Sequence, residues 1–528
     1  MQKNGYLTLF VGLIMVFSTG CGGGADDDAI STPSKIIDND SIAVFPGAEG
    51  FGIYTTAGRG GTIYKVTNLQ SSGSGSLRAC ITAKGPRTCI FEVSGYIQLA
   101  NDIGIYEPYL TIAGQTAPSP GITIRGGGLV IFTHDILIQH VRVRIGDDPV
   151  TSNSDNRDAL GLNAGFGEVY NIVIDHCSFS WATDEIISMW FAGVHDITIS
   201  NSIVSEGLNH SIHPEGYHSM GILVSDHAKN IAIIKNLIAH NLDRNPLIED
   251  DSSTLIVNNV MYNTSVPLKY LGTKSDSPLF STAVENVIIP GSDTRSISDS
   301  IMVNSIPSDS VIYLSGNYSP KILNNPLCAN DAWCIAVILE SQITKLTDGD
   351  QPPVWTLTLQ VRSSDEATGW VLLNAGARPT DRDTVDERIV NDVINNTGQL
   401  IDCVASGESV QHVGEIQSGS TLGTAVISAD SRAETDALTD YKIRLSSTNQ
   451  VRKIISNDEN TKVVTVDSNW DVIPAVGSHY TIFTDCSRNA GGWPYLANNY
   501  RELHIPDNPN SDDNGNGYTN LEDWLHTF

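Results

Sequence analysis

A short pattern of alternating apolar residues recurs five times in the middle of the chain. It reads DILIQ, NIVID, DITIS, NIAII and STLIV, beginning at Asp135, Asn171, Asp196, Asn230 and Ser253. Alternation with a period of two is typical of β-strands that bury one face. Successive starts differ by 36, 25, 34 and 23 residues, and a second short apolar strand follows each. The repeating unit is therefore a strand–turn–strand coil whose loops vary in length.

Repeats of this kind leave few folds open. A single coil cannot bury its apolar face alone, so successive coils must stack along an axis and cover one another. We therefore predict an all-β fold, a right-handed parallel β-helix or solenoid. A β-propeller would need more regular four-stranded blades than the chain contains. Variable loops beside short strands usually form the binding face.

The charge and composition restrict the ligands. The chain has 528 residues, 40% hydrophobic and 17% charged, which is enough apolar material for one large core with small appendages. The formal net charge of -29 argues against nucleic acid or any polyanion held by bulk electrostatics. An anionic substrate would need a local bridge such as Ca2+. An acidic surface is also common in soluble exported proteins, so the charge alone does not decide.

The beginning of the chain resembles an export signal. An apolar run from Leu7 to Phe17 is too short for a membrane span, and STGC follows it, ending at Cys21. Residues 1–20 are similar to a lipoprotein-type signal peptide with Cys21 as the lipidated residue, which predicts an anchor in outer-membrane lipid. Ser18 departs from the aliphatic residue usual in that motif, so release as an extracellular protein stays open. Residues 21–42 lack periodicity and predict a flexible linker.

Seven further cysteines follow Cys21. An exported protein can oxidise thiols that are close together. We therefore expect disulfides between Cys80 and Cys89 and between Cys328 and Cys334, and Cys403 and Cys486 are the candidates for a third pair. Cys177 lies in an apolar strand and is predicted to be a buried free thiol rather than a nucleophile.

A series of motifs, each weak alone, follows a fixed order along the chain. The motifs are FPGAEGFG from Phe45, GRGG from Gly58, GSGSLR from Gly73, AGQTAP from Ala113, VRVRIGDD from Val141, RDALGL from Arg157, DHCSFSWATDE from Asp175, SEGLNHS from Ser205, NPL after Arg244, DTVDERIVNDV from Asp383 and GGWP from Gly491. In this order they resemble the pectate lyases of polysaccharide lyase family 1. The resemblance covers about residues 43–403 and 487–505.

The resemblance implies an enzyme. Members of that family cleave polygalacturonate (pectate) by β-elimination on a parallel β-helix, with Ca2+ bridging the carboxylates of substrate and enzyme. It therefore implies a polysaccharide lyase, that is a carbon–oxygen lyase of pectin catabolism, with Ca2+ as cofactor. The expected partner is an acidic plant-type or algal polysaccharide. We expect no nucleic-acid partner and a monomeric protein.

The resemblance also implies roles for individual residues. Asp158 in RDALGL and Asp184 in WATDE fall where family calcium ligands lie, and carboxylates from neighbouring coils suit Ca2+. Arg244 falls where the family carries its proton-abstracting arginine. Because the pKa of arginine is above about 12, action in alkaline conditions follows. Glu185 adjoins Asp184, but consecutive strand residues point to opposite faces, so we expect it not to ligate with Asp184 unless the backbone turns there.

Several positions depart from the family pattern. A second carboxylate is common four residues after Asp184, where this chain has Ser188. A further arginine is common five residues after Arg244, where this chain has Glu249. Asn156 stands where an acidic ligand can occur, and NPL replaces the common NPR. The predicted calcium site therefore has fewer carboxylate ligands than in the best-known members.

Basic residues near these motifs are candidates for contact with a uronate chain. Arg142 and Arg144 share one strand face and could reach a carboxylate. A histidine in such a loop is more often structural. The candidates are Arg142, Arg144, His210, His213, His218, Lys235 and Lys269.

Two segments lie outside the predicted β-helix, which spans residues 43–403 and 487–505. Residues 404–486 contain short β-like runs and resemble small β modules of phage tail proteins, with the predicted Cys403–Cys486 disulfide at the base of the insert. Residues 506–528 form a tail in which DDNGNGYTNLED has the spacing of an EF-hand or dockerin loop. Its ligands for a structural calcium ion would be Asp512, Asn514, Asn516, Asn520 and Asp523.

Two classes of function stay open from the sequence. The first is an exported lyase acting on pectate or on another uronic-acid polysaccharide. The second is a non-catalytic β-helix, a carbohydrate-binding protein or adhesin that kept the scaffold and lost the activity. A hydrolase would need clustered aspartates on adjacent strands, and Asp175 with Asp184 do not clearly provide that spacing.

Overall fold

The computed structural model of the chain describes residues 42–148, 156–225, 227–272, 277–295, 300–320, 328 and 331–528. All of these residues fall in one unit of the chain, Ile42–Phe528. The predicted signal peptide and Cys21 lie outside the described residues. None of the described helices has the length and apolarity needed to cross a membrane.

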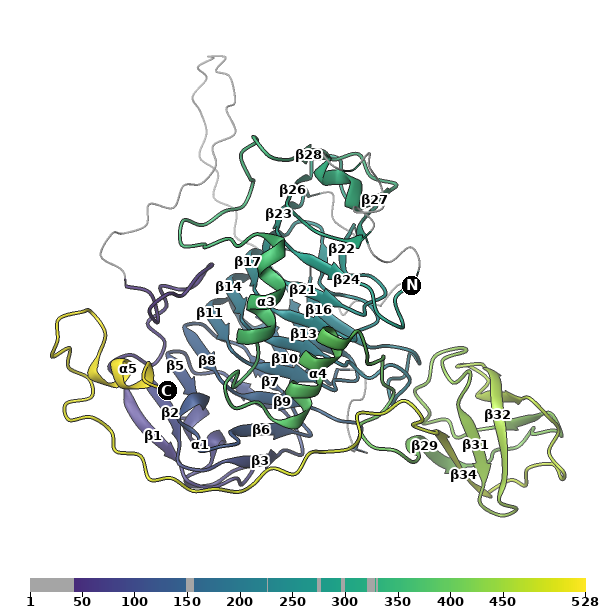
Figure 1. The fold of residues 1–528 in the computed structure, drawn as a ribbon. Coiled ribbons are helices and arrows are strands. Elements are labelled where there is room, and N and C mark those ends of the chain that lie inside the picture. Colours follow the sequence, from purple (N-terminus) through teal and green to yellow (C-terminus); the bar gives the residue numbers. More distant parts are fainter. Residues whose placement is uncertain are drawn as a thin grey trace, which may run out of the picture. The chain divides into compact units, whose positions relative to one another are not determined.

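Most strands in the described part of the chain belong to three parallel sheets of one solenoid (Figure 1). Within each sheet, hydrogen-bonded neighbours come from successive coils, so each sheet runs along the solenoid axis. This arrangement confirms the predicted right-handed parallel β-helix.

Each coil contributes strands to the three sheets in turn. The strands of the first sheet are β1 Thr62–Val66, β2 Arg87–Phe91, β5 Leu110–Ala113, β8 Ile136–Gln139, β11 Val169–Asp175, β14 Val194–Ser200, β17 Lys229–Ile234, β20 Ser253–Val257, β23 Phe280–Val284, β26 Val311–Ser315 and β28 Thr344–Leu346. Those of the second are β4 Ile103–Ile105, β7 Leu129–Ile131, β10 Leu160–Asn163, β13 Glu185–Trp190, β16 Met220–Val224, β19 Leu247–Glu249, β22 Leu268–Leu271, β25 Ile301–Asn304 and β27 Ala336–Leu339. Those of the third are β3 Gly95–Gln98, β6 Ile122–Arg125, β9 Arg142–Arg144, β12 Ser178–Ser180, β15 Ile203–Ser205, β18 Leu237–Ala239, β21 Val260–Tyr262 and β24 Val287–Ile289.

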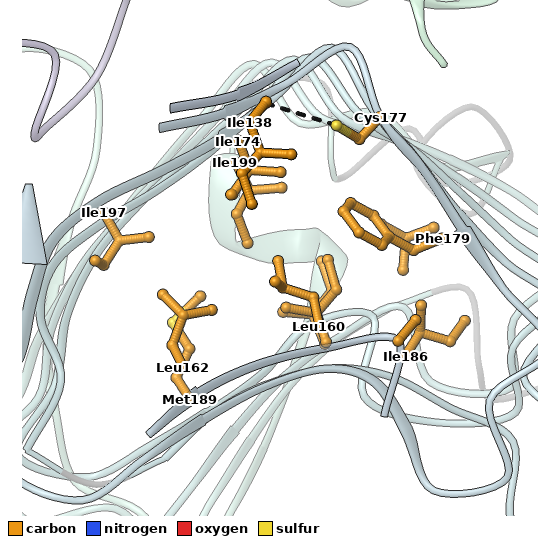
Figure 2. Close-up of a cluster of buried hydrophobic side chains, with 14 of the residues drawn as sticks. Ile138, Leu160, Leu162, Ile174, Cys177, Phe179, Ile186, Met189, Ile197 and Ile199 are labelled. Carbon is orange, nitrogen blue, oxygen red and sulfur yellow. Dashed lines mark hydrogen bonds between the residues drawn. The ribbon is translucent and has the colours of Figure 1, made fainter. Parts of the chain in front are cut away.

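The five predicted repeats are the neighbouring strands β8, β11, β14, β17 and β20 of the first sheet. One isoleucine from each of these strands occupies the same rung of the ladder: Ile138, Ile174, Ile199, Ile233 and Ile256. All five are fully buried, and Figure 2 shows the first three together in the core. Burying each such side chain contributes about 1.5–3 kcal/mol, which makes this row a main source of stability.

A left-handed backbone explains why four of the five repeats begin with Asp or Asn. The φ angle is 56° at Asp135, 53° at Asn171, 55° at Asp196 and 54° at Asn230. Short polar side chains tolerate this region better than other residues that carry a Cβ. The sequence pattern therefore marks the turn as well as the strand.

Buried asparagines complete the turns between the first and third sheets. The side-chain oxygen of Asn259 accepts the backbone N–H of Asn236 at 3.0 Å, and that of Asn286 accepts the N–H of Asn259 at 3.0 Å. The amide of Asn259 donates to the carbonyl of Ile233 at 2.8 Å. Asn317 continues the row by accepting the N–H of Asn286 at 3.1 Å. The row satisfies backbone groups that the tight turns would otherwise leave buried without partners.

Helices cover one sheet and the end of the solenoid. Helices α3 and α4 place Val371 and Ile389 against the strand residues Leu237 and Val260 of the third sheet (Figure 1). The described helices are α1 Leu77–Ile81, α3 Ser364–Asn374, α4 Thr384–Asn395 and α5 Asn520–Leu525, with 3-10 turns at Gly114–Thr116, Ala164–Phe166 and Ala332–Ile335.

Residues 404–486, called the insert below, form a six-stranded antiparallel sheet with a core of its own that includes Trp470 and Ile482. Its strands are β29 Ser409–Glu415, β30 Thr424–Val426, β31 Lys442–Leu445, β32 Gln450–Asn457, β33 Val463–Val466 and β34 His479–Thr484. The Cys403–Cys486 disulfide joins its two ends, with the Cα atoms 5.5 Å apart.

The other predicted thiol states are also found. Cys80 forms a disulfide with Cys89, and Cys328 forms one with Cys334. Cys177 is a free and fully buried thiol in the core (Figure 2).

We predict that Asn259→Ala lowers the free energy of unfolding by about 3 kcal/mol, because it leaves buried donors and acceptors on two coils without partners. Urea denaturation followed by circular dichroism measures the change. Asn391→Ala, at an exposed position of α4, is the control and should alter stability by less than about 0.5 kcal/mol. Equal small effects would contradict a stabilising role for the asparagine row.

Candidate active site

Three predicted site residues lie just before the amino ends of strands of the second sheet. Asp158 is two residues before β10, Asp184 directly precedes β13, and Arg244 is three residues before β19. The sheet pairs β10 with β13, β13 with β16, and β16 with β19. Because parallel strands stack in register, their amino ends meet at one edge although the chain separates them widely.

Three carboxylates converge at this edge. One oxygen each from Asp158, Asp184 and Glu185 lies within 4.8 Å of the others. Glu185 therefore joins Asp184, which is the case expected only where the backbone turns at this point. The backbone bends at Thr183 and Asp184, and the strand starts only at Glu185, so strand alternation does not separate the two side chains.

The carboxylates fit a hard divalent cation such as Ca2+. The Oδ1 atom of Asp158 is buried and has no hydrogen-bond partner among the described residues, while Oδ2 accepts a hydrogen bond from Ser188. Burial and the nearby charge of Asp184 raise the pKa of Asp158 well above its ordinary value. A group of converging carboxylate oxygens with an unused buried ligand atom is what Ca2+ binds.

Arg244 reaches the carboxylates from the coil that ends in β19, two coils beyond that of Asp184. Its guanidinium forms an ion pair with Glu185, and its side chain is 25% exposed. Burial lowers the pKa of Arg244, and the charges of Asp184, Glu249 and Asp158 oppose that change. A hydrogen bond from the Arg244 N–H to Asp243 at 2.7 Å supports its left-handed backbone (φ 60°). The site therefore holds a partly accessible arginine beside the carboxylate group.

Two histidines also face Asp184. The Nε2 atoms of His218 and His213 lie 2.8 Å and 3.7 Å from Asp184 Oδ1, and the two rings stack 3.8 Å apart. The backbone N–H of Glu215 donates to His213 Nδ1 at 3.2 Å. That bond leaves the ring proton of neutral His213 on Nε2, directed at Asp184. His218 therefore holds the carboxylate by a hydrogen bond, and His213, stacked on His218, faces the same oxygen from farther away.

Comparison with known proteins gives the family. No family model matches the chain. A protein named probable pectate lyase C from Aspergillus flavus is 31% identical over 366 residues, which are 69% of this chain and 80% of that protein. The chain belongs to the pectate lyase family.

A second relative is also named probable pectate lyase C. Probable pectate lyase C from Neosartorya fischeri is 34% identical over 255 residues, 48% of this chain and 56% of that protein. Among solved structures, a pectate lyase bound to hexasaccharide is similar over 65% of this chain and 100% of that chain, with a TM-score of 0.43 and 14% identity.

Arg142 and Arg144 do not face the edge where the carboxylates of Asp158, Asp184 and Glu185 converge. Both side chains are fully buried. Arg144 lies 2.8 Å from Asp386 and 2.5 Å from Asp383, and Arg142 lies 3.2 Å from Asp386. The prediction that these arginines contact substrate is wrong, because α4 covers the outer face of β9 and supplies carboxylate partners to both.

The remaining basic candidates differ in position. His210 is buried against the rings of Tyr217 and Tyr441, so the prediction that it contacts substrate is wrong. Lys235 is buried on Glu49 at 2.5 Å, away from the second sheet. Lys269 on β22 is 18% exposed and lies 3.0 Å from Asp243, so it remains a candidate for substrate contact.

The predicted calcium loop of the tail folds around two carboxylates. Asp523 accepts hydrogen bonds from the side chains of Asn514 at 2.7 Å and Asn516 at 2.9 Å. Asp512 accepts the N–H groups of Gly515 and Gly517 at 2.7 and 2.9 Å. Asn520, the fifth predicted ligand, donates to Asp513 at 2.9 Å. This loop stays a proposed structural calcium site.

We predict that Arg144→Ala lowers the free energy of unfolding by at least about 3 kcal/mol, because it leaves Asp383 and Asp386 buried with too little positive charge. Denaturant titration measures the loss. Arg295→Ala, at an exposed position, is the control and should have little effect. If Arg144→Ala were stable but bound substrate poorly, the arginine would have to face the substrate after all.

Proposed function

We propose that the protein is an exported lyase that cleaves polygalacturonate by β-elimination at the edge formed by Asp158, Asp184 and Arg244. The observation that carries the proposal is the convergence of three carboxylates beside a partly exposed arginine. The relatives named probable pectate lyase C support pectate as the substrate class. A lyase acting on another uronic-acid polysaccharide is the alternative.

In this mechanism Asp158, Asp184 and Glu185 would hold Ca2+. When bound, the cation neutralises the substrate carboxylate next to C5 and so makes the C5 proton more acidic. Ser188 donates to Asp158 and orients that carboxylate. Ser188 thus supplies positioning where many family members supply a further charge.

Arg244 is the proposed base. Its neutral guanidine removes the C5 proton, the electron pair forms the C4–C5 double bond, and the C4–O bond breaks. The leaving oxygen takes a proton from solvent. Burial favours the neutral form by lowering the pKa of Arg244, whereas the carboxylates of Asp184, Glu249 and Asp158 favour the charged form. The contact with Glu185 holds the side chain in place.

We predict that the protein forms unsaturated uronate products from polygalacturonate at alkaline pH with Ca2+, measured by their ultraviolet absorbance. EDTA should abolish the reaction. Arg244→Ala should lower kcat by at least about 100-fold because it removes the base. Arg444→Ala, which removes the Arg444–Glu408 ion pair of the insert, is the control and should keep full activity.

Each result bears on a separate part of the proposal. If no new absorbance forms on pectate, pectin or other uronans, the proposed lyase activity is rejected. Binding without cleavage would indicate a carbohydrate-binding protein. Activity that survives Arg244→Ala would remove that residue from the chemistry. Activity that survives EDTA would remove Ca2+.

The pH dependence gives an independent prediction. The neutral fraction of Arg244 rises with pH while the pH is below its pKa, so kcat/KM should rise about tenfold per pH unit in the alkaline range. In Arg244→Lys the rise should level off about 2 pH units lower, because lysine is the weaker base. Identical profiles for both proteins would show that another group is titrating.

The chain's export and organisation are part of the same proposal. We propose that residues 1–20 direct export. Either Cys21 carries lipid, or cleavage of the signal releases the protein. Residues 43–403 with 487–505 form the lyase domain around the insert. The three disulfides support an oxidising compartment.

A further inference from the structure

Residues 206–219, called the site loop below, link the candidate active site to the insert. At its beginning, Leu208 donates its N–H to the carbonyl of Ala182, two residues before Asp184, at 2.8 Å. At its end, the carbonyl of Ser219 accepts the N–H of Leu242 at 2.8 Å, two residues before Arg244. The loop therefore touches the segments that carry both the proposed calcium ligand and the proposed base.

The middle of the site loop acts directly on Asp184. His218 and His213 come from this loop and place their Nε2 atoms 2.8 Å and 3.7 Å from the Asp184 carboxylate. Both side chains are 3% exposed. Moving the loop must therefore move the groups that orient the carboxylate.

The opposite side of the loop is held by the insert. The hydroxyl of Tyr441 donates to the carbonyl of Ser211, and the Tyr441 ring lies 4.0 Å from the ring of His210. The His210 ring also stacks on the ring of Tyr217, with the ring centres 4.4 Å apart and the planes 7° from parallel. A tyrosine of the insert thus bonds the loop backbone and packs against a stacked pair of loop side chains.

Three further contacts tie the same loop to the insert. Tyr217 donates its hydroxyl to Asp440 at 3.2 Å. The N–H of Glu434 donates to the carbonyl of Pro214 at 3.0 Å. Gly216 approaches Ala437 so closely that a Cβ there would lie 2.5 Å from the Ala437 carbonyl oxygen.

The site loop contains little regular structure of its own. Within it, the only β-bridge of the described residues joins His210 to Tyr217. Loops with few internal backbone bonds open at low free-energy cost unless their surroundings hold them. The contacts with the insert therefore supply much of what fixes this loop.

We infer that the insert is a positioning element of the active site. Through Tyr441 it holds the site loop in the conformation in which His213 and His218 orient Asp184 for Ca2+. Tyr441 touches neither substrate nor cation, so it is a positioning residue. The inference rests on the proposed function, because it takes Asp184 as a calcium ligand.

Tyr441→Phe tests the inference, with Tyr480→Phe as a matched control. Both tyrosines are 1% exposed in the insert core, but the Tyr480 hydroxyl bonds Ser428 and His412 of the insert itself. Calorimetric titration with Ca2+ on the full chain measures affinity, and Asp184→Asn identifies the signal of this site against the tail loop. We expect Tyr441→Phe to raise the calcium Kd about fivefold, the effect of one hydrogen bond.

Two further readouts separate positioning from a loss of stability. The KM for Ca2+ should rise by the same factor while kcat at saturating Ca2+ stays within about twofold. Hydrogen exchange of residues 206–219 should be faster in Tyr441→Phe and unchanged in Tyr480→Phe. If Tyr441→Phe does not fold, Tyr217→Phe, which removes the bond to Asp440, should produce the same pattern.

The outcomes distinguish the two proposals. If Asp184→Asn abolishes calcium binding but Tyr441→Phe binds Ca2+ as Tyr480→Phe does, the positioning role is overturned and the proposed function stands. Faster exchange in the loop with unchanged calcium affinity overturns the positioning role too. If Asp184→Asn leaves calcium binding and cleavage intact, the proposed function fails, and the inference fails with it.

Discussion

The register of parallel strands is the constraint on which the rest of the structure depends. Each coil is hydrogen-bonded to the next with equivalent residues side by side, as where Gly161 lies beside Ser188 in the second sheet. The buried isoleucine row and the asparagine row both follow from this register. So does the site, because residues that end equivalent loops, such as Asp158 and Asp184, must meet at one edge.

The parts of the fold that could be predicted from the sequence are those that depend on interactions between residues close together in the chain. Alternation indicated the strands, and the Asp or Asn at the start of four of the five repeats marks a left-handed turn such as that at Asn171. Stacking alone then brings Asp184 and Arg244 together. Whether the backbone bends before Glu185 was left open by the sequence, because strand alternation applies only once the strand has begun.

The errors concern surfaces that are covered by distant parts of the chain. Alternation shows that Arg142 and Arg144 leave the same face of β9, but not that α4 packs on that face with Asp386 ready to pair. His210 likewise looked like a loop residue open to substrate, and only the fold brings Tyr441 against it. Local pattern gives the direction of a side chain, while long-range packing decides what it meets.

The narrow base of the insert has an evolutionary consequence. The chain leaves the host at Cys403 and returns at Cys486, 83 residues later, with the two Cα atoms only 5.5 Å apart. Such a segment adds a domain without lengthening the path of the host chain, so its presence requires no coil to shift. A scaffold whose register is so strict can therefore still diversify, by adding modules beside the candidate active site rather than by altering the coils themselves.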